Sequence, residues 1–320
     1  MESSEEVKGD DVDVPVVPRR DRIHVLREFI LDKFDVNGLR RGFVLDVAGG
    51  KGDLSFLLCN ADHLQSVVVD PRYTDHEKII RTCLWHHESR NTDKHRRQAE
   101  EGQALARLAL SPPFRMPQHL RMFFDEKLLF VLEQQQYQLN AKNNNNNNDD
   151  NNEEDERSCW DAFWEHTRQR VQKLEATFPT HRQKKKHKTT ITQQQPHSSH
   201  IVESANMVWE ILNNVTLVIG FHPDEATDVC IDFAIRRRVP FVVCPCCLFS
   251  SLFPHRRVRD GKGIDRPVTN YEEYVRYLRE KHPRIRVERL PFRSNATGHG
   301  EGLVRNTVLY MLPSDYERHE

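Results

Sequence analysis

Residues 43–53 read Phe-Val-Leu-Asp-Val-Ala-Gly-Gly-Lys-Gly-Asp, and this stretch decides the fold of the chain. Its first five residues form a short apolar run, which is typical of a buried parallel strand. Ala48, Gly49, Gly50 and Gly52 then allow a sharp turn, because small residues let the main chain approach itself or a ligand closely. The stretch predicts a strand, a tight turn and a helix whose N-terminus faces a ligand.

A second apolar run follows and ends in an acidic residue. Ser66 to Val69 precedes Asp70 and Pro71, which predicts a second strand and completes a right-handed strand-helix-strand unit. Asp70 lies twenty residues after Gly50, where a carboxylate can accept the ribose hydroxyls of an adenosine. The glycine-rich loop and the distal acid together predict a site for a nucleoside-containing cofactor.

The rest of the chain alternates between predicted helices and strands. Apolar periodicity predicts helices near 23–34, 54–58, 160–178, 225–237 and 271–281, and strands at 119–124, 216–219, 241–243, 285–290 and 307–312. We therefore expect an α/β fold. Specifically, the pattern predicts a Rossmann-like three-layer α/β/α sandwich with a mostly parallel seven-stranded sheet and an antiparallel C-terminal strand.

Composition predicts one domain with polar additions. Of the 320 residues, 37 % are hydrophobic, which suffices for one sizeable core. We expect residues 1–18 to be a disordered acidic tail and residues 19–320 to be a single domain. Two low-complexity inserts, at about 140–157 and 181–200, interrupt this domain because their composition cannot bury enough apolar area to fold.

Charge and cysteine content restrict the partners and the compartment. Lysine plus arginine (47) balances aspartate plus glutamate (48), so any basic surface for nucleic acid must be local. Seven cysteines without a framework-like spacing are typical of reduced thiols in the cytoplasm or nucleus. We find no secretory signal and no apolar stretch near the roughly 20 residues that span a bilayer, so we expect no membrane partner. We also expect no obligate protein partner.

The glycine-rich loop resembles a known motif. Asp46 to Gly52 is similar to the first motif of class I methyltransferases, D/E-x-G-x-G-x-G, in which Ala48 takes the place of the first glycine. The resemblance implies that the cofactor is S-adenosyl-L-methionine and that residues 19–320 are a methyltransferase domain. It also implies that the loop holds the methionine moiety, that Asp70 binds the ribose and that Asp125 binds the adenine amine. The cofactor-binding residues implied in this way are Asp46, Ala48, Gly49, Gly50, Gly52, Asp70 and Asp125.

Two other interpretations of the loop stay open. A nicotinamide or flavin dehydrogenase requires G-x-G-x-x-G, and residues 50–55 carry Ser55 in place of the third glycine. The glycines could also form a tight turn that binds no ligand.

The loops after the fourth and fifth predicted strands should frame the methyl acceptor, because ligands bind beyond the carboxyl ends of such strands. These loops, 220–228 and 244–247, resemble a methyltransferase branch that includes the eukaryotic tRNA ribose methyltransferase and the domain of glutathione-transferase-C-terminal-domain proteins. The residues that match are His222, Ala226, Thr227, Asp228, Pro245, Cys246 and Cys247. At 223–225 the chain departs from that branch. The resemblance, over roughly 20–80 and 205–312, implies RNA, with tRNA as one candidate, as the acceptor.

His222 is the candidate general base. An imidazole titrates near neutrality and could take a proton from a ribose hydroxyl or a ring nitrogen, with Asp224 or Asp228 orienting it. The catalytic candidates are therefore His222, Asp224 and Asp228. In the alternative interpretation His222 packs locally and Asp224 caps the following helix.

The substrate-binding candidates are Cys246, Cys247, Arg256 and Arg257. The arginines, together with Arg259, could contact RNA. The cysteines could instead be buried as small apolar residues, or bind zinc together with Cys244 and His222, but neighbouring cysteines rarely reach one tetrahedral ion. We therefore predict no metal site.

The function predicted from the sequence is S-adenosylmethionine-dependent methyl transfer to RNA. The alternatives are methyl transfer to a protein or small molecule and a non-catalytic cofactor-binding scaffold that uses the aromatic helix at 160–178 to hold a partner. An NAD-dependent dehydrogenase is a further alternative.

Overall fold

A computed structural model describes residues 21–73, 110, 113–134, 151–177, 200–259, 263–292 and 305–317. The predicted acidic tail lies outside these residues, as do 140–150 of the first predicted insert and 181–199 of the second. Residues 151–157, which we expected to belong to the first insert, form the N-terminal turns of helix α7, Asn151–Thr177.

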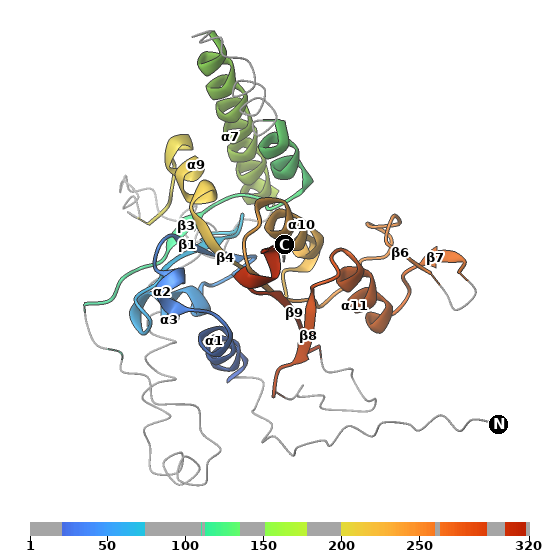
Figure 1. Ribbon diagram of the computed structural model, residues 1–320. Helices are drawn as coiled ribbons and strands as arrows, with labels where there is room; N and C mark the ends of the chain where they lie inside the picture. The colour runs from blue at the N-terminus through green and yellow to red at the C-terminus, as the bar shows by residue number, and fades with distance from the viewer. Residues whose placement is uncertain are drawn as a thin grey trace, which may run out of the picture.

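Seven strands form one sheet in the order β3-β2-β1-β4-β5-β9-β8 (Figure 1). Neighbouring strands from β3 to β5 run parallel, whereas β9 runs antiparallel to both β5 and β8. The strands are β1 Phe43–Val47, β2 Gln65–Val69, β3 Gln118–Leu120, β4 Val215–Phe221, β5 Phe241–Cys244, β8 Arg286–Arg289 and β9 Thr307–Met311. The predicted fold class is confirmed.

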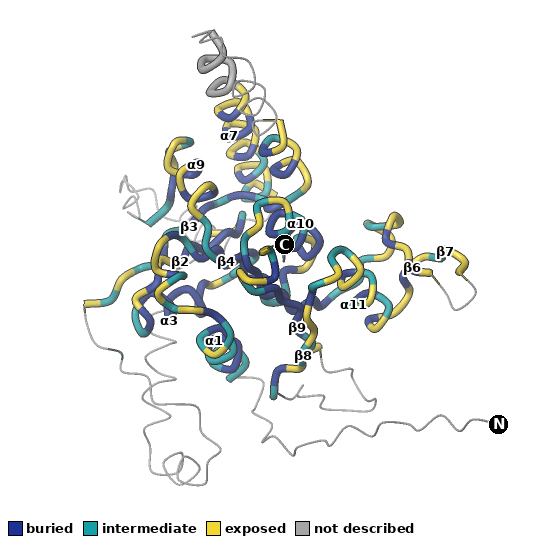
Figure 2. The backbone as a smooth tube through the Cα atoms, in the orientation of Figure 1, coloured by how far each residue is buried: buried dark blue, intermediate teal, exposed yellow. Residues whose placement is uncertain are grey.

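Each face of the sheet carries its own apolar core, because successive strand residues point to opposite faces. On β1, Val44 packs with one group of helices, and the next residue, Leu45, packs with the other. The first group is α1 Arg22–Lys33, α2 Val36–Leu39 and α3 Asp53–Asn60. The second group is α7, α9 Ala205–Asn213, α10 Thr227–Arg237 and α11 Tyr271–Glu280. Figure 2 shows the central strands as a deeply buried layer.

Smaller elements lie around this core. Two 3₁₀ helices, η2 Asp224–Ala226 and η3 Pro313–Tyr316, follow β4 and β9. A separate two-stranded sheet consists of β6 Arg257–Arg259 and β7 Asp265–Pro267. None of the helices that the structure describes has the length and apolar character needed to cross a membrane.

The third strand is shorter than the sequence predicted. We expected it to span 119–124, but β3 ends at Leu120, opposite Val69 at the end of β2. The chain then turns, with the N–H of Met122 donating to the carbonyl of Leu120 at 3.0 Å. Residues 126–134 are helical. Asp125 lies at the start of this helix, where its carboxylate accepts from the N–H of Lys127 at 3.2 Å.

The aromatic face of α7 packs onto the core of the protein. Trp160, Phe163 and Trp164 are all buried. The indole of Trp160 donates to the carbonyl of Ala205 at 2.8 Å, and that of Trp164 donates to the carbonyl of Glu203 at 2.9 Å. Because these bonds satisfy the polar end of each indole, the aromatic face joins α7 to α9 and to the residues before it.

Candidate functional site

The glycine-rich loop leaves the carboxyl end of β1 in a conformation that demands small residues. Ala48, Gly50 and Gly52 all have left-handed backbones, with φ of 53°, 57° and 77°. A Cβ atom at Gly49 would lie 2.7 Å from Cγ of Asp46, which is too close for any side chain. Ala48 tolerates its conformation at a cost of about 1 kcal/mol. The loop then enters α3, with Gly52 as the N-cap residue.

Asp46 lies beneath the loop and is buried. Its Oδ2 accepts a hydrogen bond of 2.8 Å from Ser55, whose Oγ in turn accepts one of 2.9 Å from Ser66. Burial raises the pKa of Asp46 to about 7, against the opposing effect of the Ser55 hydrogen bond. Ser55, which takes the place of the third glycine of the dinucleotide motif, thus holds the first turn of α3 against β1 and β2.

Asp70 directly follows β2, and its side chain reaches the loop. Its Oδ2 accepts from the backbone N–H of Gly50 at 3.1 Å, so the structure joins the two features that the sequence analysis paired. Arg72 also contacts this carboxylate, with Nε 3.0 Å from Oδ1 and Nη2 2.8 Å from Oδ2. The carboxylate is 1 % exposed and the Arg72 side chain 65 % exposed, so the guanidinium covers the acid from the solvent side. Sequence reasoning missed Arg72.

Asp125 contacts other parts of the protein. Besides the N–H of Lys127, it accepts a hydrogen bond of 2.6 Å from Arg170 on α7. These contacts anchor the helix at 126–134 to α7. The role at the adenine amine that the resemblance implies stays a prediction, although this carboxylate already has two partners.

The loop after β4 has an unusual backbone. His222 and Asp224 both have left-handed conformations, with φ of 56° and 48°, on either side of Pro223. The N–H of His222 donates to the carbonyl of Cys244 at 3.0 Å, which links this loop to the end of β5. Residues other than glycine rarely adopt such backbone conformations. The residues that do adopt them cluster at binding and catalytic sites. Asp224 begins η2, so it caps neither η2, whose N-cap is Pro223, nor α10, whose N-cap is Ala226.

The loop after β5 brings thiols to the same place. Sγ of Cys246 lies 3.2 Å from Oδ1 of Asp224, and Sγ of Cys247 lies 3.3 Å from Nη1 of Arg305. Among the described residues, the candidate ligand atoms of Asp224, Cys246 and Cys247 lie within 4.8 Å of one another. Burial and the neighbouring Asp224 raise the pKa of the Cys246 thiol. The structure therefore brings together the two loops that the sequence analysis expected to face the acceptor.

Two predicted site residues instead form a buried charge network. Asp228, which we expected to orient His222, pairs with Arg256, lies 3.3 Å from Nζ of Lys281 and accepts from the Tyr274 hydroxyl at 3.3 Å. Arg256, which we expected to contact a substrate, is 2 % exposed. Its guanidinium lies 3.8 Å from the ring centre of Phe253 and 4.5 Å from that of Tyr274. Partners within the protein therefore hold both side chains, as a buried arginine requires an acidic partner, and their predicted roles at the site stay predictions.

Arg257, unlike the adjacent Arg256, is not part of the buried charge network. It is exposed on β6, where it donates to the backbone carbonyl of Asp265 at 2.9 Å. Arg259, two residues on, is also exposed. Their exposure leaves both arginines accessible to an anionic substrate.

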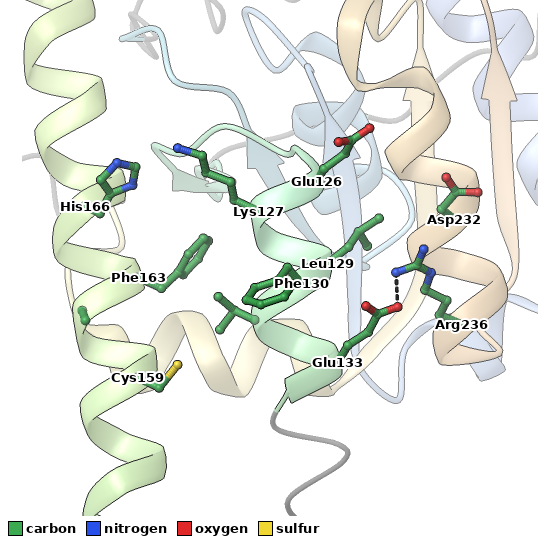
Figure 3. A pocket seen from close by; sticks show the side chains of 12 residues that line it. Glu126, Lys127, Leu129, Phe130, Glu133, Cys159, Phe163, His166, Asp232 and Arg236 are labelled. Atoms are coloured by element: carbon green, nitrogen blue, oxygen red, sulfur yellow. Dashed lines mark hydrogen bonds and ion pairs between the residues drawn. The ribbon is translucent and has the colours of Figure 1, made fainter. Parts of the chain in front are cut away.

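A groove of about 730 Å³ lies elsewhere, between the helix at 126–134, α7 and α10 (Figure 3). Phe130 and Phe163 extend into it from opposite sides, and Glu133 pairs with Arg236 at its edge. The groove is lined mostly by helix residues rather than by loops at the carboxyl edge of the sheet. It contains none of the predicted site residues.

Comparisons of the chain with protein-family models, curated proteins and solved structures find no match. The interpretation of the site therefore depends on its own residues.

The buried charge network predicts a large difference between two adjacent arginines. Arg256→Ala should lower the free energy of unfolding by about 3–5 kcal/mol, because it leaves Asp228 buried without its main partner. Arg257→Ala, at an exposed position, should change it by less than about 0.5 kcal/mol. Urea unfolding of both variants measures the difference. Equal effects would contradict the assignment of Arg256 to the interior.

The raised pKa of Asp46 predicts a pH-dependent stability. The folded chain keeps a proton on this carboxyl up to about pH 7, whereas the unfolded chain releases it near its ordinary value of 3.8. Stability should therefore fall as pH rises from about 4 to 7, by at most about 1.4 kcal/mol per pH unit from this group. Asp46→Asn should remove this contribution, and Asp32→Asn, at an exposed position of α1, should keep it. Unfolding curves across this range provide the measurement; a slope unchanged in Asp46→Asn would contradict the pKa.

Proposed function

We propose that this chain is an S-adenosyl-L-methionine-dependent methyltransferase. The observation that carries the proposal is the 3.1 Å hydrogen bond from the Gly50 N–H to Asp70. It puts a loop of small residues, a helix N-terminus and a strand-end carboxylate at one point of an open α/β sheet. That combination suits a ligand with a sugar hydroxyl pair next to a compact charged group.

The order of the strands favours this proposal over a dehydrogenase. Dinucleotide-binding sheets of the Rossmann type have the order 3-2-1-4-5-6. Here β9 inserts between β5 and β8 and runs antiparallel to both. An antiparallel C-terminal strand pair is what the resemblance to methyltransferases implies, and the missing third glycine of the dinucleotide motif agrees with it.

The residues fit the cofactor at both ends. The backbone from Ala48 to Gly52 and the start of α3 would hold the methionine moiety, and Asp70 would accept hydrogen bonds from the ribose hydroxyls. Because Arg72 contacts both oxygens of Asp70, it must move aside for the ribose, and its exposed side chain gives it the freedom to do so. The bound cofactor would supply an electrophilic methyl group.

The acceptor side lies next to this loop. Val47, the last residue of β1, pairs with Gly220 on β4, so the glycine-rich loop and His222 leave the sheet from neighbouring positions. The pKa of Arg72 is raised, chiefly by its hydrogen bond to Asp70 and the charge of that carboxylate, and to a smaller extent by the charge of Asp224 in the loop after β4. In-line methyl transfer needs the acceptor atom about 3–3.5 Å from the methyl carbon, so these loops would act mainly by positioning. His222 would take the proton of a hydroxyl or ring nitrogen.

RNA is the acceptor class that we propose, on the basis of the resemblance and of the exposed Arg257 and Arg259. A protein or a small molecule is the alternative acceptor. The scaffold alternative loses its main support, because the aromatic face of α7 that was to hold a partner is packed on the core.

Cofactor binding tests the proposal with a matched pair of glycines. Gly50 and Gly263 both have left-handed backbones with no close contact around Cβ, but Gly263 lies just before β7, in the separate two-stranded sheet. Calorimetry should show that S-adenosylhomocysteine binds the wild type and Gly263→Arg alike. Gly50→Arg should abolish binding, and Asp70→Ala should weaken it at least about tenfold. Equal binding by all four proteins, or a preference for NAD, would overturn the cofactor assignment.

Methyl transfer itself tests the acceptor side. Incubation with labelled cofactor and a total cell extract should label an RNA fraction, and His222→Ala should reduce the rate by about 10²–10⁴-fold while cofactor binding is kept. Label in protein or small molecules would replace the RNA assignment. Normal rates in His222→Ala would remove the general base.

A further inference from the structure

We propose that Asp224, Cys246 and Cys247 bind one Zn²⁺ ion and leave one coordination position for water or a substrate atom. The proposal reverses our expectation from the sequence that the chain has no metal site. It goes beyond methyl transfer and does not depend on it.

The cluster brings together ligands from two loops. Asp224 comes from the loop after β4 and the cysteines from the loop after β5, and their ligand atoms lie within 4.8 Å of one another. Zinc bonds of about 2.3 Å to sulfur and 2.0–2.2 Å to oxygen separate tetrahedral ligands by roughly 3.5–3.8 Å. The cluster thus needs to close by about 1 Å. The objection that neighbouring cysteines rarely reach one ion does not hold here, since both Sγ atoms already lie near the same carboxylate.

The kind and number of ligands match an open zinc site. Two thiolates and one carboxylate are donors that Zn²⁺ accepts, and sites with three protein ligands keep the fourth position for water or substrate. Arg305 contacts Sγ of Cys247 at 3.3 Å, as an outer partner that orients a ligating thiolate would. Among the described residues, the cluster includes neither His222 nor Cys244, and Sγ of Cys244 points to the carbonyl of Arg305 at 3.5 Å.

The charges explain why a cation would be bound. Without metal, the Cys246 thiol donates a hydrogen bond to Asp224 at 3.2 Å. A thiol is a weak donor, so this bond compensates little of the negative charge of the carboxylate. Zinc would displace the protons of both thiols and place its double positive charge among the two thiolates and the carboxylate. A water or hydroxyl in the fourth position would lose its proton more readily, which suits a site beside a proposed acceptor.

Zinc titration of the full, reduced and chelator-treated chain tests the proposal. We expect one equivalent of Zn²⁺ with a dissociation constant below about 1 µM, accompanied by proton release. Asp224→Ala, Cys246→Ser and Cys247→Ser should each raise the dissociation constant at least about tenfold. Cys159→Ser, at an exposed cysteine of α7, is the matched control and should bind like the wild type.

Thermal unfolding of the same variants separates loss of zinc from loss of folding. Asp224 is exposed, so Asp224→Ala should keep the metal-free unfolding temperature and lose only the rise that zinc causes. Less than about a tenth of an equivalent of bound zinc, or equal affinity in Asp224→Ala and the wild type, would overturn the proposal. The proposal would also be overturned if the chain bound no zinc and formed a Cys246–Cys247 disulfide in air. S-adenosylhomocysteine binding, measured separately, reports on the proposed function alone.

Discussion

The hydrogen bond between the Gly50 N–H and Asp70 is the contact on which the site depends. It joins the loop after β1 to the end of β2, and it forms only if the loop turns back over its own strand. This conformation of the loop requires a glycine at position 49, since any Cβ atom there would clash with Asp46. One backbone donor and one carboxylate therefore hold the glycine-rich loop against the end of β2, at the carboxyl edge of the sheet.

The same edge contains several features that reduce stability. Asp46 is buried at the base of the loop with a pKa raised to about 7, and His222 and Asp224 have left-handed backbones. Proteins tolerate such features where function requires them and compensate elsewhere. Here the compensation lies in the two apolar cores on either face of the sheet and in the Asp228–Arg256 pair, which anchors the segment after β5 to α10 and α11.

Local patterns predicted most of the strands and the glycine-rich turn, because apolar periodicity and glycines report backbone structure directly. β1 and the strand-end position of Asp70 match the structure. Residues whose environment depends on distant partners were not predictable in this way. Arg256 looked like an exposed basic residue until Phe253, Tyr274 and Asp228 enclosed it. Likewise, no spacing in the sequence indicates that Asp224 meets Cys246, because that contact depends on the pairing of β4 with β5.

We propose that the Gly50–Asp70 corner binds the nucleoside of S-adenosyl-L-methionine. NMR tests this binding by following the amide resonance of Gly50 while S-adenosylhomocysteine is added to the labelled chain. We expect a saturable shift of the Gly50 resonance and no shift of the Gly263 resonance. A Gly50 resonance that stays unchanged at saturating ligand, or that shifts with NAD instead, would contradict it.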